Sequence, residues 1–123
     1  MNNHSIKDKV YTIYNTPEYN KWLDEEPLKS QVQVCFRIAN VQDDGRFEDH
    51  KELGDRVCEL RWKNGRRIYY AEISKKQVIL LLGGNKNSQD KDIRQAKKIF
   101  NRHISLNEKL KNGTELRQSK GRL

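Results

Sequence analysis

The chain has 123 residues, of which 34% are hydrophobic, and this predicts a single domain with a modest core and some exposed loop or tail. A formal net charge of +8 and a pI near 9.6 favour nucleic acid, an anionic membrane surface or an acidic protein as partner. The longest apolar run, 78–82, is too short to cross a bilayer and no apolar signal segment opens the sequence, so we expect a cytoplasmic protein without a membrane partner.

The N-terminal part of the chain predicts one strand followed by two helices. Segment 9–15 is rich in β-branched and aromatic residues, and it stops at Thr16, which is expected to cap a short helix with Pro17 at its first position. Pro27 opens a second helix to about residue 42, and the two helices are expected to pair on one face of a sheet. The second helix carries an apolar stripe of Leu28, Val32, Cys35, Phe36 and Ala39.

The middle of the chain predicts a loop and then three strands. Residues 43–55 are charged and rich in turn formers, which indicates a loop. Strands are expected at 56–62, 66–73 and 77–82. Because the last of these is apolar throughout, we expect it in the centre of the sheet, covered on both sides and ended by the two glycines that follow it.

A final helix is expected to begin near Asn87 or Ser88. Its buried side is predicted to consist of Ile93, Ala96, Ile99 and Phe100. After His103 the chain becomes polar and basic. We therefore assign residues 1–103 to one domain and residues 104–123 to a basic polar extension, either a frayed helix or a disordered tail.

Three arginines fall in the predicted hairpin within 59–70. A two-residue turn would place Arg67 on the same face as the apolar Leu60, which is a poor core position. A three-residue turn with Gly65 in the left-handed conformation instead pairs Arg61 with Arg67. Only this second register separates apolar from polar side chains, so we predict it. The polar face would then carry Glu59, Arg61, Arg67 and Tyr69.

Two interpretations of this polar face remain open. Guanidinium groups directly opposite one another repel, so the pairing of Arg61 with Arg67 needs a reason. The face is either solvated, with Glu59 as a counterion, or it is a concave surface that receives a phosphate, to which bidentate arginines are well suited.

No motif for a metal or a cofactor is visible. The histidines His4, His50 and His103 are scattered, and the chain contains no CxxC, HxH or HExxH pattern. We therefore expect neither a metal nor a cofactor. The cysteines Cys35 and Cys58 lie within apolar patterns and are interpreted as reduced core residues.

Four short motifs follow one another along about residues 9–103. They are G-x-x-x-D-x-K-x-L-G from Gly45, V-x-E-L-R from Val57, G-x-R-x-Y-Y from Gly65, and L-L-x-G-G-x-K-x-x-Q-x-x-D-I-x-x-A from Leu80. In this order they resemble the RelE/ParE superfamily of toxin–antitoxin toxins, and in particular its HigB-like branch of addiction-module killer proteins.

The resemblance implies an α+β fold. In it, two N-terminal helices pack on a twisted, mainly antiparallel sheet of about four strands, with a C-terminal helix and a working face opposite the two N-terminal helices. It also implies the toxin of a type II module, an mRNA endonuclease that cuts in the ribosomal A site without a metal. The mRNA 2′-OH would attack the adjacent phosphate and leave a 2′,3′-cyclic phosphate and a 5′-OH. The implied partners are the ribosome, mRNA and an antitoxin, typically a helix-turn-helix protein.

Roles for single residues are implied by their positions in these motifs. Arg67 is expected to contact the scissile phosphate, and Arg61 and Lys86 to donate further charge, the lysine also to the leaving 5′ oxygen. Alternatives are a plain turn lysine at 86, a solvated loop at 46–51 and a packed strand tyrosine at 69. RNA contacts, including a base stacked on the tyrosine, are expected at Arg66, Tyr69, Lys51, Arg46 and Gln89.

The chain differs from the best-known RelE enzymes in two places. Glu59 stands where those enzymes have a lysine, and the final helix offers only Asn87 and Ile93 where they use a tyrosine or an arginine. Three functions therefore remain open: a ribosome-dependent mRNA endonuclease, a ParE-like gyrase inhibitor, and a catalytically inactive nucleic-acid-binding module of the same fold. The predicted cluster of Arg61, Arg67 and Lys86 favours the endonuclease.

Overall fold

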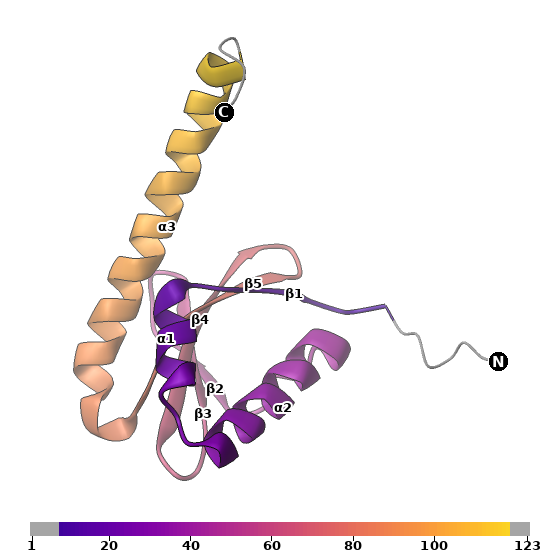
Figure 1. The fold of residues 1–123 in the computed structure, drawn as a ribbon, viewed down its shortest axis with the longest axis vertical. Coiled ribbons are helices and arrows are strands. Elements are labelled where there is room, and N and C mark those ends of the chain that lie inside the picture. Colours follow the sequence, from indigo (N-terminus) through magenta and orange to yellow (C-terminus); the bar gives the residue numbers. More distant parts are fainter. Residues whose placement is uncertain (1–7, 119–123) are drawn as a thin grey trace, which may run out of the picture.

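The computed structural model describes residues 8–118, which form a five-stranded sheet between two helical layers (Figure 1). The first elements are β1 (Thr12–Asn15), α1 (Pro17–Asp24) and α2 (Leu28–Asp44). They are followed by β2 (His50–Glu52), β3 (Val57–Arg61), β4 (Arg66–Ser74), β5 (Gln77–Asn85), a 3-10 turn (Lys86–Ser88) and α3 (Gln89–Gln118). The strand order is β1-β5-β4-β3-β2, in which β1 is parallel to β5 and the other pairs are antiparallel. The predicted α+β class with a C-terminal helix is confirmed.

Thr16 joins β1 to α1 as the sequence predicts. Its Oγ1 accepts a hydrogen bond from the backbone N–H of Tyr19 at 3.1 Å, and Pro17 occupies the first turn of the helix. The same hydroxyl lies 3.0 Å from the carbonyl oxygen of Leu80, to which it can donate, so the cap also ties the start of α1 to β5. The short helix is therefore fixed to the centre of the sheet from its first residue.

The helix α2 turns a different face to the sheet from the one that its apolar stripe suggests. Leu28, Val32 and Phe36 are 75%, 60% and 70% exposed, whereas Val34 and Arg37 are buried. Apolar side chains lie on two arcs of this helix, and periodicity alone cannot tell which arc packs. Cys35 lies on the exposed arc, so its interpretation as a core residue is wrong; neither it nor the half-buried Cys58 is in a disulfide.

The sheet is larger than predicted at two places. Residues 50–52, expected within a loop, form the edge strand β2 against β3, which raises the strand count to five. β5 does not end at its glycines but continues to Asn85. A Cβ on Gly83 would lie 2.1 Å from the Trp22 ring, and one on Gly84 would lie 2.1 Å from Asp92 Oδ2. The glycines therefore admit close neighbours on both faces instead of ending the strand.

Hydrophobic cores lie on both sides of the sheet, with α1 and α2 on one side and α3 on the other (Figure 1). Tyr19 and Val34 pack with residues of β3, β4 and β5 on the first side. Ala96, Ile99 and Phe100 of α3 pack on the second side. On the face opposite the N-terminal helices, where the working face is expected, α3 buries its own apolar side and covers the middle of the strands. The prediction that β5 is a central strand covered on both sides is correct.

The helix α3 continues well past the predicted domain and extends beyond the sheet (Figure 1). Of the predicted extension 104–123, residues 104–118 are helical and residues 119–123 lie outside the described residues. None of the helices within residues 8–118 is long and apolar enough to cross a membrane.

Candidate nucleic-acid interface

The β3–β4 hairpin has the predicted three-residue turn. Gly65 has a φ of +102°, and its N–H donates to the carbonyl oxygen of Trp62 at 3.0 Å. The N–H of Trp62 in turn donates to the carbonyl oxygen of Arg66 at 3.0 Å. Arg61 is directly opposite Arg67 in the ladder, so the predicted register is confirmed.

This register places several charged side chains on the α3 face of the sheet. Side chains directly opposite one another in neighbouring strands share a face. Arg61 pairs with Arg67, and the next row joins Lys51 of β2 to Glu59 of β3 and Tyr69 of β4. The face that carries the two arginines therefore also carries the lysine and a carboxylate beside them.

Arg67 is largely enclosed, with 14% of its side chain exposed. Its Nη1 donates to the carbonyl oxygens of Arg66 at 3.0 Å and Trp62 at 3.3 Å, which holds the guanidinium at the start of β4. Its Nε lies 4.0 Å from Glu59 Oε2 and makes no hydrogen bond with the described residues. Since a guanidinium has five N–H donors, Arg67 retains donors that an added anion can use.

Glu59 has no exposed surface and lies under the start of α3. Gln89 Nε2 donates to both carboxylate oxygens, at 3.2 and 2.9 Å. A buried carboxylate needs such partners, because burial removes its hydration. Gln89, expected to contact RNA, thus uses its amide group to hold an internal acid.

Tyr69 is also fully buried, in the core beneath α3. Burial raises the pKa of its phenol, and the charges of Glu59 and Asp92 raise it further, while Arg67 opposes them. The side chain is therefore a neutral packing residue, and stacking on a base is incompatible with this position. The packing alternative considered from the sequence is the one that the structure supports.

Arg61 and Lys86 are more accessible than Arg67. Arg61 donates through Nη2 and Nε to Asp49 Oδ1 at 3.0 and 3.3 Å, and 34% of its side chain is exposed. Exposed pairs of this kind contribute little to stability, so a phosphate can replace Asp49 at low cost. Lys86 is exposed, and its stem packs on the hairpin turn, where a Cβ on Gly65 would lie 3.2 Å from Lys86 Cγ. The three residues with predicted catalytic roles thus come from the same end of β3, β4 and β5.

The other predicted RNA contacts are not all in this cluster. Arg66 points to the opposite face, where its guanidinium carbon lies 5.3 Å from the centroid of the Trp62 ring. Arg46 is in the loop after α2 and pairs with Asp44 at 3.0 Å. Lys51 is exposed and shares the face of the cluster through its pairing with Glu59. We call Arg61, Arg67, Lys86 and Lys51 the basic cluster.

Arg37 is a buried residue that the sequence analysis missed. Its guanidinium donates to the carbonyl oxygens of Arg61, of Phe47 at 2.9 Å and of Asp49 at 2.8 Å, and it lies 4.4 Å from the centroid of the Trp62 ring. Burial lowers the pKa of Arg37, although nearby carboxylates, among them that of Asp49, oppose this. The residue thus joins α2 to the loop that positions the partner of Arg61. The available signal was its spacing of three and four residues from Val34 and Val41, both buried.

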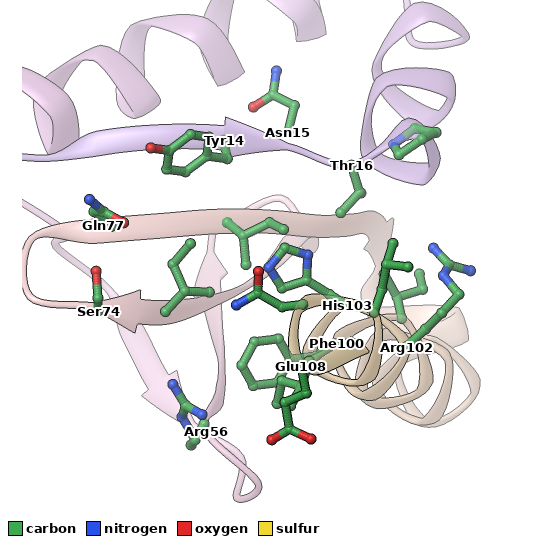
Figure 2. Close-up of a pocket in the computed structure, with 17 residues that line it drawn as sticks. Tyr14, Asn15, Thr16, Arg56, Ser74, Gln77, Phe100, Arg102, His103 and Glu108 are labelled. Atoms are coloured by element: carbon green, nitrogen blue, oxygen red, sulfur yellow. The ribbon is translucent and has the colours of Figure 1, made fainter. Parts of the chain in front are cut away.

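A sizeable cavity lies away from the basic cluster. It has a volume of about 850 Å³, and Figure 2 shows Tyr14 of β1, Gln77 of β5 and His103 of α3 around it. None of the residues with predicted site roles lines it. The cluster is therefore an open surface, which suits a polymer better than a small molecule. Across the described residues, no group of three or more His, Cys, Asp or Glu side chains is placed to hold a metal ion.

Comparisons with known proteins relate the chain to one sequence family and one fold. Residues 21–103 match the family of phage-derived Gp49-like proteins. An uncharacterised protein of Haemophilus influenzae is 39% identical over 88 residues, which cover 69% of this chain and 88% of that protein.

Two solved structures illustrate the likeness of fold. A mutant of the Escherichia coli RelE toxin in the free state has a TM-score of 0.59 and 18% identity, covering 73% of this chain and 98% of its own. A chain of the intact E. coli RelBE toxin–antitoxin complex has a TM-score of 0.52 and 18% identity, and the match covers 61% of this chain and 95% of that one. The predicted RelE/ParE relationship is thus confirmed at the level of fold.

Proposed function

Because the chain belongs to the family of phage-derived Gp49-like proteins and has the fold of RelE toxins, we propose that it is the toxin of a type II toxin–antitoxin module. We further propose that it is a ribosome-dependent, metal-independent mRNA endonuclease that inhibits translation. The observation that carries this proposal is the cross-strand pair of Arg61 and Arg67, with Lys86 beside it at the open end of the sheet.

The chemistry of RNA cleavage explains why this cluster suits the reaction. The 2′-OH loses its proton to water, its oxygen forms a bond to phosphorus as the bond to the 5′-oxygen breaks, and negative charge builds on the non-bridging oxygens. Arg67 offers free donors from a fixed guanidinium, and Arg61 can exchange Asp49 for the phosphate. Lys86, exposed at the rim, is suited to protonate the leaving 5′-oxygen. The three cations supply the charge stabilisation that a divalent metal supplies in other nucleases.

The open shape of the surface supports a dependence on the ribosome. Lys51 and Lys86 of the basic cluster are exposed, and none of its residues lines the cavity of about 850 Å³. Positioning a flexible RNA for in-line attack is entropically costly. An enzyme without a closed site therefore needs a second macromolecule that holds the RNA in order. mRNA held in the ribosomal A site is already ordered, so the ribosome can supply the missing constraint.

An antitoxin is the second proposed partner. The RelE toxin is found with its antitoxin in the solved RelBE complex, and the excess of basic residues on this chain fits an acidic or amphipathic antitoxin segment, expected from a helix-turn-helix protein. Complementary charge accelerates association and makes it sensitive to salt. An association rate that does not change between low and high salt would contradict this part of the proposal.

Pulse labelling after induced expression tests the proposed activity in cells. We expect protein synthesis to stop before DNA synthesis. Earlier loss of DNA synthesis, with gyrase-linked breaks, would instead identify a ParE-like gyrase inhibitor.

End-group analysis of mRNA cleaved on purified ribosomes tests the chemistry. The fragments should carry 2′,3′-cyclic phosphate and 5′-OH ends, as attack by the 2′-oxygen requires. Fragments with 5′-phosphate ends would show hydrolysis by water and contradict the proposed mechanism. No cleavage by the folded protein would leave the gyrase inhibitor and the inactive binding module, which the pulse labelling separates.

A further inference from the structure

The exposed face of α3 carries a row of basic side chains. We propose that this row is a second nucleic-acid-binding surface, which holds the phosphate backbone of RNA without regard to sequence. It lies outside the basic cluster, and its binding does not depend on cleavage. We call it the basic track, and it consists of Lys91, Arg94, Lys98, Arg102 and Lys109.

Helical spacing places these residues on one side of α3. Steps of three, four and seven residues return to the same face of a helix with 3.6 residues per turn. All five side chains are exposed, whereas Ala96, Ile99 and Phe100 on the opposite side are buried against the sheet. From Lys91 to Lys109 the track is about 27 Å long, at about 1.5 Å per residue.

The charge of the track is mostly uncompensated. Arg102 pairs with Glu18 at 2.6 Å, but the other four residues form no ion pair with the described side chains. Asp90 lies four residues before Arg94 and Glu108 lies near the end of the track, but neither forms an ion pair with a described side chain, and Asp92 accepts a hydrogen bond from Ser88. Like charges four residues apart, such as Arg94 and Lys98, destabilise a helix. An external polyanion would remove this repulsion.

The composition of this face favours nucleic acid over a protein or a membrane. Its remaining positions are mostly polar, among them Gln95, Asn101 and Ser105, and a single large aliphatic side chain, that of Leu106, is exposed between Arg102 and Lys109. Protein interfaces depend on clusters of aromatic and large aliphatic anchors. A helix lying in a membrane surface needs a free apolar face, and the apolar side of α3 packs on the sheet. A phosphate backbone, by contrast, is bound by positive charge alone.

The track begins beside the basic cluster. Lys91 and Arg94 line the same surface hollow of about 540 Å³ as Lys86. From there the positive charge runs along α3 to Lys109, away from the sheet. One RNA strand can therefore contact the cluster and continue along the track.

Binding of a non-cleavable RNA tests the track without requiring activity. The probe is a short uridine-only single strand with 2′-O-methyl groups, which lacks the attacking hydroxyl. Binding is followed by fluorescence anisotropy over a range of salt concentrations. The track variant replaces Lys91, Arg94, Lys98 and Lys109 by Gln, and the matched control replaces the exposed Lys9, Lys21, Lys29 and Lys75 by Gln.

The two variants lose the same charge, so they separate the track from net charge. The track variant should weaken binding at least about tenfold and reduce the slope of log K against log salt by about 3, since each single-strand phosphate contact contributes about 0.7. The control should change the slope by less than about 1. A third variant, with Lys91, Lys98 and Lys109 replaced by Arg, should bind like the wild type.

Three results would overturn the proposal. The first is an equal loss of binding in the track and control variants. The second is unchanged RNA binding in a track variant whose circular dichroism matches the wild type. The third is a track variant that keeps RNA binding but loses binding to phosphatidylserine vesicles, which would make the face a membrane contact.

Discussion

Arg67 Nε lies 4.0 Å from the carboxylate of Glu59, a side chain with no exposed surface, so the arginine proposed to bind phosphate also balances a buried acid. The only other described polar contact of that carboxylate is Gln89, whose amide is neutral. The guanidinium of Arg67 therefore serves both the proposed phosphate binding and the stability of the fold. Any test of Arg67 has to separate the two roles.

Arg67→Ala should lower cleavage of ribosome-bound mRNA by about 10²-fold or more, because one lost contact to a developing oxyanion is worth about 3 kcal/mol. It should also destabilise the fold by about 3 kcal/mol, because it leaves Glu59 buried without a cation. Arg67→Lys should rescue cleavage only partly, since an ammonium lacks the bidentate fork. The measurements are cleavage assays on folded protein and urea melts.

A double variant, Arg67→Ala with Glu59→Gln, provides the control for stability. It should recover much of the lost stability, because the unpaired buried charge is gone, but it should remain defective in cleavage. If this folded double variant cleaved RNA near the wild-type rate, Arg67 would have no role in cleavage. Arg61 and Arg67 would then be charges on a sheet face with a structural role only.

Arg37→Met should destabilise the protein by roughly 3 kcal/mol, because three carbonyl groups lose their hydrogen bond from the guanidinium. It should also increase hydrogen exchange at the backbone N–H of Arg61, which donates to the carbonyl oxygen of Asp49 at 2.9 Å. Chemical denaturation and exchange measured by NMR check both effects. Arg46→Met, at an exposed loop position, should stay within about 0.5 kcal/mol of the wild type. Equal effects of the two substitutions would contradict the structural role of Arg37.

Val34→Ala should destabilise the protein more than Phe36→Ala, although phenylalanine is the larger side chain. Val34 is fully buried, so loss of its two methyl groups should cost about 2 kcal/mol. Phe36 is 70% exposed, so its truncation should change the free energy of unfolding by about 0.5 kcal/mol or less. Thermal or urea melts of the two variants measure this difference in stability. A larger loss for Phe36 would mean that α2 packs through its other arc.

Glu18 should make stability depend on pH in the acid range. Burial by itself would raise its pKa, but hydrogen bonds, chiefly from Arg102, and the charge of Arg102 outweigh burial, so the pKa lies below its ordinary value. The folded state therefore binds the proton more weakly than the unfolded state. The resulting stability is present above the unfolded pKa of about 4.3 and is lost as the pH falls through the folded pKa.

Melting temperatures measured across this range provide the check. The wild type should be more stable than Glu18→Gln at pH values near 7, and the gap should close below about pH 4. Arg102→Gln should cause a similar loss at neutral pH, and adding Glu18→Gln to it should have little further effect, because the two side chains form one pair. If the wild type stayed more stable than Glu18→Gln in acid, the ion pair of Glu18 with Arg102 would not be the cause of the difference in stability.

The parts of the fold that were predictable depend on local signals. Thr16 and Pro17 begin α1 because a hydroxyl cap and a fixed φ are encoded in adjacent residues. The turn before Gly65 fixed the pairing of Arg61 with Arg67, since a slip of one residue would exchange the two faces. The same turn brings Arg61 and Arg67 together at one end of the sheet.

The parts that were missed depend on contacts between distant segments. β2 is only three residues long, and it is a strand because β3 offers it a free edge. The face of α2 is chosen by carbonyl groups that Arg37 reaches in another part of the chain. Tyr69 lies in a strand pattern that fits either solvent or packing, and only the position of α3 decides that it is buried. No local pattern contains that information.

The parallel pairing of β1 with β5 has a consequence for how the protein is made. Thr12 is opposite Gln77, so the first strand has no partner until nearly two thirds of the chain has been synthesised. Domains fold as units during synthesis, and contacts between distant residues form late. A chain that stops before β5 lacks the central strand, Lys86 and the helix that covers Glu59. We therefore expect a translation product that is interrupted before β5 to be open to proteolysis, and the proposed activity to require synthesis through the start of α3.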